Sequence, residues 1–165
     1  MKQHGFTLIE LIVVLAIAGI LMAIATLSFR TMSSKSNIEG QIKQMYTDLM
    51  TARIEAMDRN TYHFVTLNAK QYAVYEDTLG TCTTGNCQIA GEDLLLNPPA
   101  MTNAILWNAA TPSNAEIIFD NRGLVQVTTG TISINDTVGA AYDCILIETT
   151  KTNMGAMSGG TCVPK

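Results

Sequence analysis

Proline is missing from the first third of this sequence. None occurs between Phe6 and Asn60, and Gly19 and Gly40 are the only glycines in that stretch. Proline breaks or kinks a helix, whereas a single glycine costs only about 1 kcal/mol. We therefore expect one helix of about 55 residues, roughly 80 Å long. Its weakest part is 33–37, Ser-Ser-Lys-Ser-Asn, where bending or fraying is expected.

Charge is scarce at the front of the chain. From Phe6 to Ala25 there are twenty residues, and Glu10 is the only charged one. A helix of that length, apolar on all sides, spans roughly 30 Å, which is the hydrocarbon thickness of a bilayer. We assign residues 6–30 to a membrane-spanning or filament-core half of the helix. A carboxylate there costs about 2.5–3.5 kcal/mol or more at mid-bilayer, so Glu10 either stays hydrated at the interface or pairs with a cation of another copy.

The sequence lacks the signatures of an active site. It has no phosphate-binding glycine loop and no nucleophile elbow. His63 lies in a strand-like run and is interpreted as a packed or surface residue. The acidic pairs at 76–77 and 92–93 offer oxygen ligands suited to Ca²⁺, but too few of them. We therefore expect a protein that is not an enzyme, with no cofactor and no metal site.

Basic clusters are also absent. From Thr61 onward there are nine acidic residues and four basic ones, so the C-terminal part of the chain is acidic. That balance disfavours nucleic acid as a partner, because nucleic-acid binding depends on clustered lysine and arginine.

Only four cysteines are present, and their number is even. They are Cys82, Cys87, Cys144 and Cys162. In a chain carried across a membrane this predicts disulfides, with three pairings open. We favour Cys82–Cys87 and Cys144–Cys162, since each closes a local loop rich in turn-forming residues. A structural zinc site is the alternative, although neither pair has the short C-x-x-C spacing.

Beyond Arg30 the helix becomes amphipathic. Its apolar residues recur at steps of four and three, which places them on one face: Ile38, Ile42, Met45, Leu49, Ala52 and Ala56. Tyr46, Met50 and Met57 widen this stripe. Charged residues occupy the opposite positions: Lys43, Asp48, Arg53, Glu55 and Arg59. We expect this half, residues 31–60, to lay its apolar stripe on a globular domain formed by 61–165.

After Asn60 the apolar period changes to two, which is typical of strands. The expected strands are 62–67, 72–75, 105–107, 116–119, 124–127, 131–134 and 142–149. The first two should form a hairpin, and 124–127 should form another with 131–134. Residues 78–100 are predicted to be a loop, and the chain beyond 149 a glycine-rich tail held by Cys162. One helix on an antiparallel sheet is an α+β fold.

The stretch Gly5-Phe6-Thr7-Leu8-Ile9-Glu10, preceded by Met1-Lys2-Gln3-His4, resembles the leader of type IV pilins and pseudopilins. The resemblance implies that a prepilin peptidase removes residues 1–5 by cutting between Gly5 and Phe6, and then N-methylates Phe6. A single span would hold the mature chain in inner-membrane lipid, with its C-terminal domain in the periplasm. An assembly platform in that membrane would insert it among other pilin subunits of a pilus or pseudopilus. There Glu10 would neutralise the Phe6 ammonium of a neighbour, since a buried ion pair needs both partners.

Residues 52–60, followed at once by a strand, and 118–123 resemble the FimT/GspH group of minor pilins and pseudopilins. This resemblance implies a structural subunit of a type IV pilus with an assembly, priming or tip role. The alternatives are a pseudopilin of a type II secretion system and a minor pilin that captures DNA. The tail, 154–165, has one lysine and no arginine, which disfavours DNA capture. Leu27 stands where many pilins carry proline, so we expect a straighter helix there.

Two other interpretations of the front remain. An ordinary secretory signal peptide could end at the A-x-A sites 16–18 or 23–25, although Glu10 would be out of place in its apolar core. A plain single-pass anchor is the other. The positive-inside rule does not orient the span, because Lys2 precedes it while Arg30 and Lys35 follow it.

Overall fold

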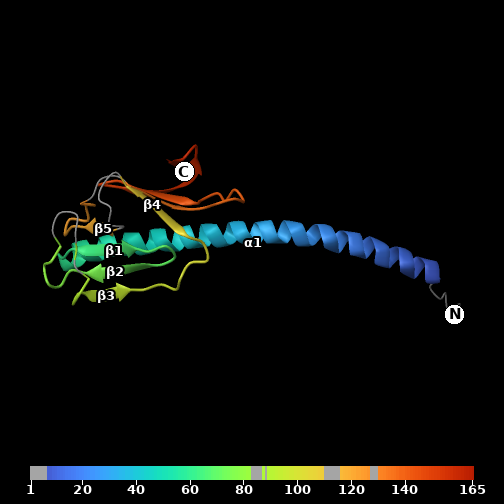
Figure 1. Cartoon of the computed structure of the whole chain (residues 1–165), viewed down its shortest axis with the longest axis horizontal. Coiled ribbons are helices and arrows are strands. Elements are labelled where there is room, and N and C mark those ends of the chain that lie inside the picture. Colours follow the sequence, from blue (N-terminus) through green and yellow to red (C-terminus); the bar gives the residue numbers. More distant parts are fainter. Residues whose placement is uncertain (1–6, 83–86, 88, 110–115, 127–129) are drawn as a thin grey trace.

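One long helix dominates the structure. The computed structural model describes residues 7–82, 87, 89–109, 116–126 and 130–165, with the backbone alone at 25–28 and 109. The helix, α1 (Leu8–Arg59), has 52 residues. Its N-terminal half projects away from the strands, and its C-terminal half lies against them (Figure 1). The predicted long helix is confirmed. It also runs without interruption through 33–37, where burial of the neighbouring Ile38 offsets the weak local propensity.

Both ends of α1 are capped. Thr7 has extended backbone angles, and its Oγ1 accepts a hydrogen bond of 3.3 Å from the N–H of Glu10. At the other end Asn60 adopts a left-handed conformation with φ of 55°, and its N–H donates to the carbonyl of Ala56. Asparagine is one of the few residues besides glycine that adopt this conformation readily. This turn sends the chain back along the helix.

A four-stranded antiparallel sheet follows, in the order β3-β2-β1-β5. Its strands are β1 (His63–Leu67), β2 (Tyr72–Glu76), β3 (Asp93–Leu96) and β5 (Glu116–Phe119). β1 and β2 form the predicted hairpin, in which Val65 lies opposite Val74. β5 pairs with the other edge of β1, with Ile117 opposite Val65. The register therefore places three β-branched side chains side by side.

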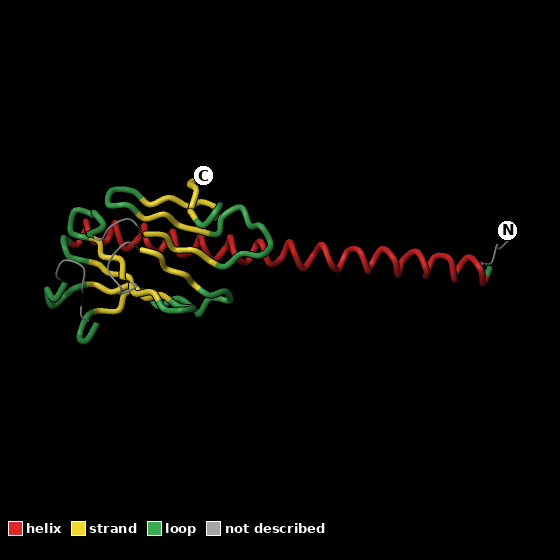
Figure 2. Tube along the Cα trace, turned by 45° about the horizontal axis from the view of Figure 1, so that its top comes forward, coloured by secondary structure: helices red, strands yellow, loops and turns green. Residues whose placement is uncertain are grey.

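A second antiparallel sheet has five strands in the order β4-β6-β7-β8-β9. They are β4 (Ile105–Ala109), β6 (Gly130–Ile134), β7 (Cys144–Ile147), β8 (Thr152–Ser158) and β9 (Thr161–Pro164). The two sheets lie on different sides of the C-terminal half of α1, and the chain ends on the second one (Figure 2). The predicted α+β architecture is confirmed, with two sheets in place of the single sheet expected.

Two local predictions between residues 78 and 134 are wrong. The segment 78–100 contains strand β3, whose apolar run Leu94 to Leu96 pairs along β2. The predicted hairpin between 124–127 and 131–134 does not form. Val125 instead bridges to Phe119, and its N–H donates to the carbonyl of Thr149, while β6 pairs with β4 and β7. Of the expected turn, 128–130, residues 128 and 129 lie outside the described residues, and Gly130 begins β6.

The chain beyond 149 is a hairpin and not a loose tail. β8 pairs with β7 on one side and β9 on the other. Two consecutive glycines with positive φ, Gly159 and Gly160, form its turn. Glycines that suggested flexibility in the sequence thus serve a tight connection between strands.

The core lies between α1 and both sheets. All six residues of the predicted stripe, from Ile38 to Ala56, are buried. They pack with inward-facing residues of the first sheet, such as Val65 and Ile117, and of the second, such as Ile132 and Ile145. Each fully buried aliphatic side chain contributes about 1.5–3 kcal/mol. This shared core fixes both sheets to the C-terminal half of the helix.

The predicted exposure of Asp48 is wrong. Asp48 is only 8% exposed, and its carboxylate accepts hydrogen bonds from the hydroxyl of Tyr72 and from Nε2 of Gln44. Burial, and then the bond to this carboxylate, raise the pKa of Tyr72 well above its usual range. Met57, predicted to widen the apolar stripe, is largely exposed.

Candidate functional site

The N-terminal half of α1 presents apolar side chains to its surroundings on every side. Leu8 is 76% exposed and Ile9 is 71% exposed, and the large apolar residues described from Leu11 to Ile24 are exposed as well. An 18-residue window of this helix has a mean hydropathy of 2.8, with no residue buried inside the protein. Among the described residues, this is the one helix long and apolar enough to cross a membrane. Such a surface has to be covered by lipid or by other helices.

Glu10 lies in the first turn of this exposed helix. The sequence Thr7-Leu8-Ile9-Glu10 has the spacing of a capping box, and the structure forms the bond from Glu10 N–H to Thr7 Oγ1. A carboxylate at this position also faces the positive end of the helix dipole. The cap accounts for the helix beginning here, but it uses only the backbone N–H of Glu10 and not its carboxylate.

The surroundings of that carboxylate are apolar. Glu10 borders a shallow depression of about 230 Å³ whose other lining residues are Leu11, Val14 and Leu15. Within the described part of the chain, its carboxylate forms no hydrogen bond or ion pair. A charge surrounded by aliphatic groups is stable only when a cation or water reaches it. The predicted cleavage and methylation residues, Gly5 and Phe6, lie outside the described residues.

The sheet region contains two disulfides, and they follow the pairing that the sequence favours. Cys82 bonds to Cys87 across a separation of five residues, and Cys144 bonds to Cys162 across eighteen. Cys144 and Cys162 are both almost completely buried. With all four sulfurs in disulfides, none remains to ligate zinc.

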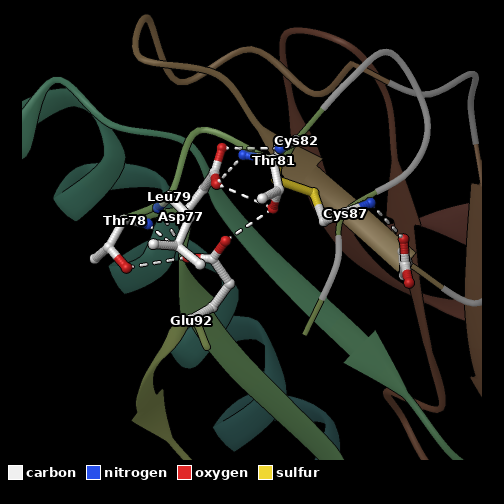
Figure 3. Close-up of a disulfide and its surroundings, with 8 residues drawn as sticks. Asp77, Thr78, Leu79, Thr81, Cys82, Cys87 and Glu92 are labelled. Carbon is white, nitrogen blue, oxygen red and sulfur yellow. Dashed lines mark hydrogen bonds between the residues drawn. A yellow bond between two sulfur atoms is a disulfide. The ribbon is translucent and has the colours of Figure 1, made fainter. Parts of the chain in front are cut away.

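Two buried carboxylates order the chain before the first disulfide (Figure 3). Asp77 accepts hydrogen bonds from the backbone N–H groups of Thr81 and Cys82. Glu92 accepts them from the backbone N–H groups of Thr78 and Leu79 and from the Thr81 hydroxyl. Burial alone would raise the pKa of Glu92, but these bonds hold its pKa below the usual range.

Those hydrogen bonds also bear on the calcium alternative. The oxygens of Asp77 and Glu92 are occupied by backbone and hydroxyl donors, and Glu76 accepts from Arg59 and Thr61. In the part of the chain that the structure describes, no three histidine, cysteine or acidic side chains gather as metal ligands. The acidic pairs therefore organise loops and strand ends.

His63 is completely buried at the interface between β1 and α1. Its Nε2 lies 3.8 Å from Oε2 of Glu55, and neither ring nitrogen has a hydrogen-bond partner among the described residues. Burial lowers the pKa of His63, against the opposing effect of the Glu76 carboxylate. The histidine is thus a packed residue, one of the two roles that the sequence allows.

Several polar residues that matter to the structure escape sequence reasoning. Asp120 is buried. Its Oδ2 accepts hydrogen bonds from Nε and Nη2 of Arg122, and its Oδ1 accepts one from the backbone N–H of Leu124. The run Asp120-Asn121-Arg122-Gly123 does indicate a turn, and Gly123 has the positive φ that this turn needs. No comparable signal predicts the hydrogen bonds of Asp48, Asp77 or Glu92, because their partners are remote or lie in irregular loops.

Comparison with known families gives two matches. A family model described as prokaryotic N-terminal methylation motif matches residues 1–26. A second, described as type II transport protein GspH, matches residues 41–150. No curated protein and no solved structure matches the chain. The first match covers the exposed apolar part of the helix with Glu10, and the second covers the buried stripe from Ile42 onward and most of the two sheets.

Proposed function

The chain belongs to the GspH family of type II transport proteins, and from this membership we propose that it is a structural minor subunit of a pilus or pseudopilus. The methylation motif and the GspH match together make it a type IV pilin-like protein or pseudopilin, anchored by its N-terminal helix. Families of this kind are structural, and we propose that this member is likewise not an enzyme.

The observation that carries the proposal is Glu10 on an exposed apolar helix, where its carboxylate has no partner among the described residues. We propose that prepilin peptidase cuts between Gly5 and Phe6 and methylates Phe6. The new ammonium then supplies the cation that Glu10 lacks, from a neighbouring copy. Before assembly the same helix spans the inner membrane once, with residues 61–165 in the periplasm. An assembly platform in the inner membrane then transfers the subunit from the lipid into the filament.

Mass spectrometry of the mature protein tests the processing step. The amino-terminal peptide should begin at Phe6 and carry one additional methyl group. A mature chain that begins at residue 19 or 26, after an A-x-A site, would instead identify an ordinary secretory signal. An uncut Met1 would identify a plain anchor.

Substitution of Glu10 tests the assembly step. Glu10→Val should leave membrane insertion intact, since it removes the costly carboxylate. It should lower incorporation into filaments by about a hundredfold or more, because an unpaired buried charge costs about 3–5 kcal/mol. Glu10→Gln is the matched control for shape, and it should fail as strongly as Glu10→Val. Incorporation of either variant at the level of the unaltered protein would refute the pairing role.

A type II secretion pseudopilus is the second candidate for the filament, and the match to a family of type II transport proteins favours it. The subunits that co-purify with the full chain after cross-linking in membranes would identify the machine. DNA capture is the weaker alternative, because the sheet region carries excess negative charge. Salt-sensitive retardation of DNA by the purified chain at physiological ionic strength would support it.

A further inference from the structure

A groove with a polar lining lies where the sheet region meets the exposed half of α1. It has a volume of about 170 Å³ and lies between α1, the loop 97–104 before β4 and the loop 135–143 after β6. Both loops are at the end of the sheet region that faces the projecting half of the helix (Figure 1). We call this site the polar groove. Six of its eight lining residues carry a hydroxyl or an amide and no charge: Ser34, Asn37, Thr102, Asn103, Asn135 and Thr137.

These six side chains have no partners within the described part of the chain. None of them forms a hydrogen bond with another described residue. A hydroxyl both donates and accepts, and a side-chain amide carries two donor hydrogens and an acceptor oxygen. Uncharged donors and acceptors gathered in this way match the hydroxyl groups of a polyol. The groove volume is several times the roughly 30 Å³ of a water molecule, so a short polyol has room in it.

The walls of the polar groove are held by the fold. The carboxylate of Asp136 accepts hydrogen bonds from three successive backbone N–H groups, 138–140, which orders the loop after β6. Glu39 accepts another at 2.9 Å from the N–H of Ala141, which ties that loop to α1. Carbonyls of the β1–β2 turn hold the loop before β4 at both ends, through bonds of 2.7 and 2.8 Å. The groove is therefore built before any ligand arrives.

One cation lies below the groove on the same side of α1. Arg30, Ser34 and Asn37 recur at steps of four and three, so they share one face of the helix. Arg30 forms no hydrogen bond or ion pair with another described residue. The acids beside the groove, Glu39 and Asp136, are occupied by the backbone donors of the loop after β6. The guanidinium is thus free to bind an anion at the mouth of the groove, and phosphate suits its geometry.

The position along the helix matches the headgroup layer of a membrane. Glu10 and Arg30 bracket nineteen residues without charge, which is roughly 28 Å of helix and close to the hydrocarbon thickness of a bilayer. The headgroups add about 5–8 Å on each side. Ser34 and Asn37 lie about 6 and 10 Å beyond Arg30 along the axis. With Arg30 at the edge of the hydrocarbon, the groove opens at the level of the headgroups.

We propose that the polar groove binds the headgroup of an anionic phospholipid whose phosphate carries a polyol, of which phosphatidylglycerol is the simplest case. This inference rests on the membrane-spanning role proposed for α1. The Arg30 guanidinium binds the phosphate, the hydroxyl and amide groups of the groove bind the polyol, and the acyl chains lie along the exposed apolar half of the helix. The bound lipid holds the sheet region at one height above the membrane, and it has to leave when the subunit enters a filament.

Native mass spectrometry of the full chain in a non-ionic detergent tests this site. Titration with phosphatidylglycerol should give one tightly retained lipid per chain. Phosphatidylserine has the same net charge and no polyol, so it should be retained about fivefold more weakly, because the hydrogen bonds of the groove are not made. Glycerol 1-phosphate, the soluble form of the same chemistry, should bind far more weakly than either lipid, because it lacks the acyl chains.

Two charge variants separate the site from general attraction to an anionic surface. Arg30→Gln should weaken retention of phosphatidylglycerol about fivefold, which is the effect of one basic residue beside anionic lipid. Lys35→Gln is the matched control. Lys35 is five residues from Arg30, so it projects about 140° away from it around the helix, and its loss should change retention by less than about twofold.

Two amide variants test the recognition of the polyol. Asn103→Ala combined with Asn135→Ala should bring phosphatidylglycerol to within about twofold of phosphatidylserine, because the remaining attraction depends on charge. Asn108→Ala, an exposed position in β4 outside the groove, should leave the preference unchanged. None of the substituted residues belongs to the core, and Trp107 fluorescence should show unchanged folding in every variant.

Three results would overturn the inference. The first is equal retention of the two lipids by the unaltered chain. The second is an equal loss in Arg30→Gln and Lys35→Gln, which would show that charge alone attracts the lipid. The third is binding of glycerol 1-phosphate as tightly as the lipid, which would identify a soluble ligand.

The outcome is separable from that of the proposed function. If Phe6 is methylated and Glu10 is required for assembly while both lipids bind equally, the proposed function stands and only this site is wrong. If Met1 is retained while the preference for phosphatidylglycerol holds, the pilin role fails and the lipid site stands.

Discussion

Gly155 lies directly beneath the sulfur of Cys162. A Cβ atom placed on Gly155 would lie 3.1 Å from that Sγ and 2.3 Å from the carbonyl oxygen of Val163. The register explains this proximity, since Gly155 in β8 lies opposite Cys144 in β7 and Pro164 in β9. The Cys144–Cys162 disulfide joins β7 to β9, the strands on either side of β8, and glycine leaves the space for it.

Gly155→Ala should therefore lower the free energy of unfolding by about 1–3 kcal/mol, the usual cost of overpacking a well-packed interior. Denaturant unfolding of the full chain in detergent, followed by the fluorescence of Trp107, measures this directly, because the chain has one tryptophan. Gly40→Ala is the matched control. A Cβ there meets no atom within 4 Å, so this helix position should gain about 0.5–1 kcal/mol. Equal effects of both substitutions would contradict the steric explanation.

The buried bond between Tyr72 and Asp48 should contribute to stability. Tyr72→Phe removes the hydroxyl and leaves the Asp48 carboxylate with Gln44 as its remaining side-chain partner. Loss of a hydrogen bond to a charged group costs about 1.5–3 kcal/mol, which the same unfolding measurement should detect.

Tyr75→Phe controls for loss of a tyrosine hydroxyl in the same strand. Tyr75 stacks on Phe64 with ring centroids 5.2 Å apart, and its hydroxyl has no hydrogen bond among the described residues. That variant should stay within about 0.5 kcal/mol of the unaltered protein. A Tyr72→Phe variant equally close to it would show that Asp48 is hydrated in solution.

Buried His63 should make the fold sensitive to mild acid. Burial lowers its pKa in the folded state, so the unfolded chain binds the proton more readily. Stability should fall as the pH drops below about 6.5, the pKa of an unperturbed histidine, and continue to fall through the lowered folded pKa. Glu55 and Glu76 oppose this loss and Arg59 adds to it.

Unfolding free energies measured between pH 7.5 and 5 test this sensitivity. His63→Gln does not titrate and should lose most of the decline in this range. Further loss below about pH 4.5 should persist in that variant, because hydrogen bonds lower the pKa of Glu92 and Asp120. A decline from pH 7.5 to 5 that is the same in both proteins would show that another group is responsible.

The two disulfides should differ in their contribution to stability. On the chain-entropy model, Cys144→Ser with Cys162→Ser should cost about 3 kcal/mol, and Cys82→Ser with Cys87→Ser about 2 kcal/mol, because the first bond closes the longer loop. Unfolding of both double variants, compared with the oxidised parent, gives these values. A larger cost for the shorter loop would mean that the carboxylate contacts of Asp77 and Glu92 depend on the disulfide.

How far the sequence predicts this protein depends on the range of the interactions. The helix and its stripe from Ile38 to Ala56 are predictable, because period and helix propensity act within one or two turns. The β1–β2 hairpin is predictable for the same reason. Strand β3 and the β8–β9 hairpin are missed, since their pairing depends on neighbours that local patterns do not identify.

The residues of the candidate site are also predictable only where short sequence spacings define them. Glu10 is conspicuous in the sequence because a charge interrupts an apolar run, and the Thr7 cap follows from a four-residue spacing. Asp48 is misassigned to the exposed face because its partner Tyr72 is 24 residues away. Side-chain contacts at such separations depend on how helix and sheet are docked.

By itself, then, the sequence determined the long apolar helix, the carboxylate in its first turn and the cysteine pairing that it favoured, because these depend on composition and on short spacings. Only the tertiary structure decided that two sheets share one helix, that Gly155 makes room for a disulfide, and that Asp48 is buried against the hydroxyl of Tyr72. Those relationships arise when distant segments are brought together by a common core, and no local pattern encodes them.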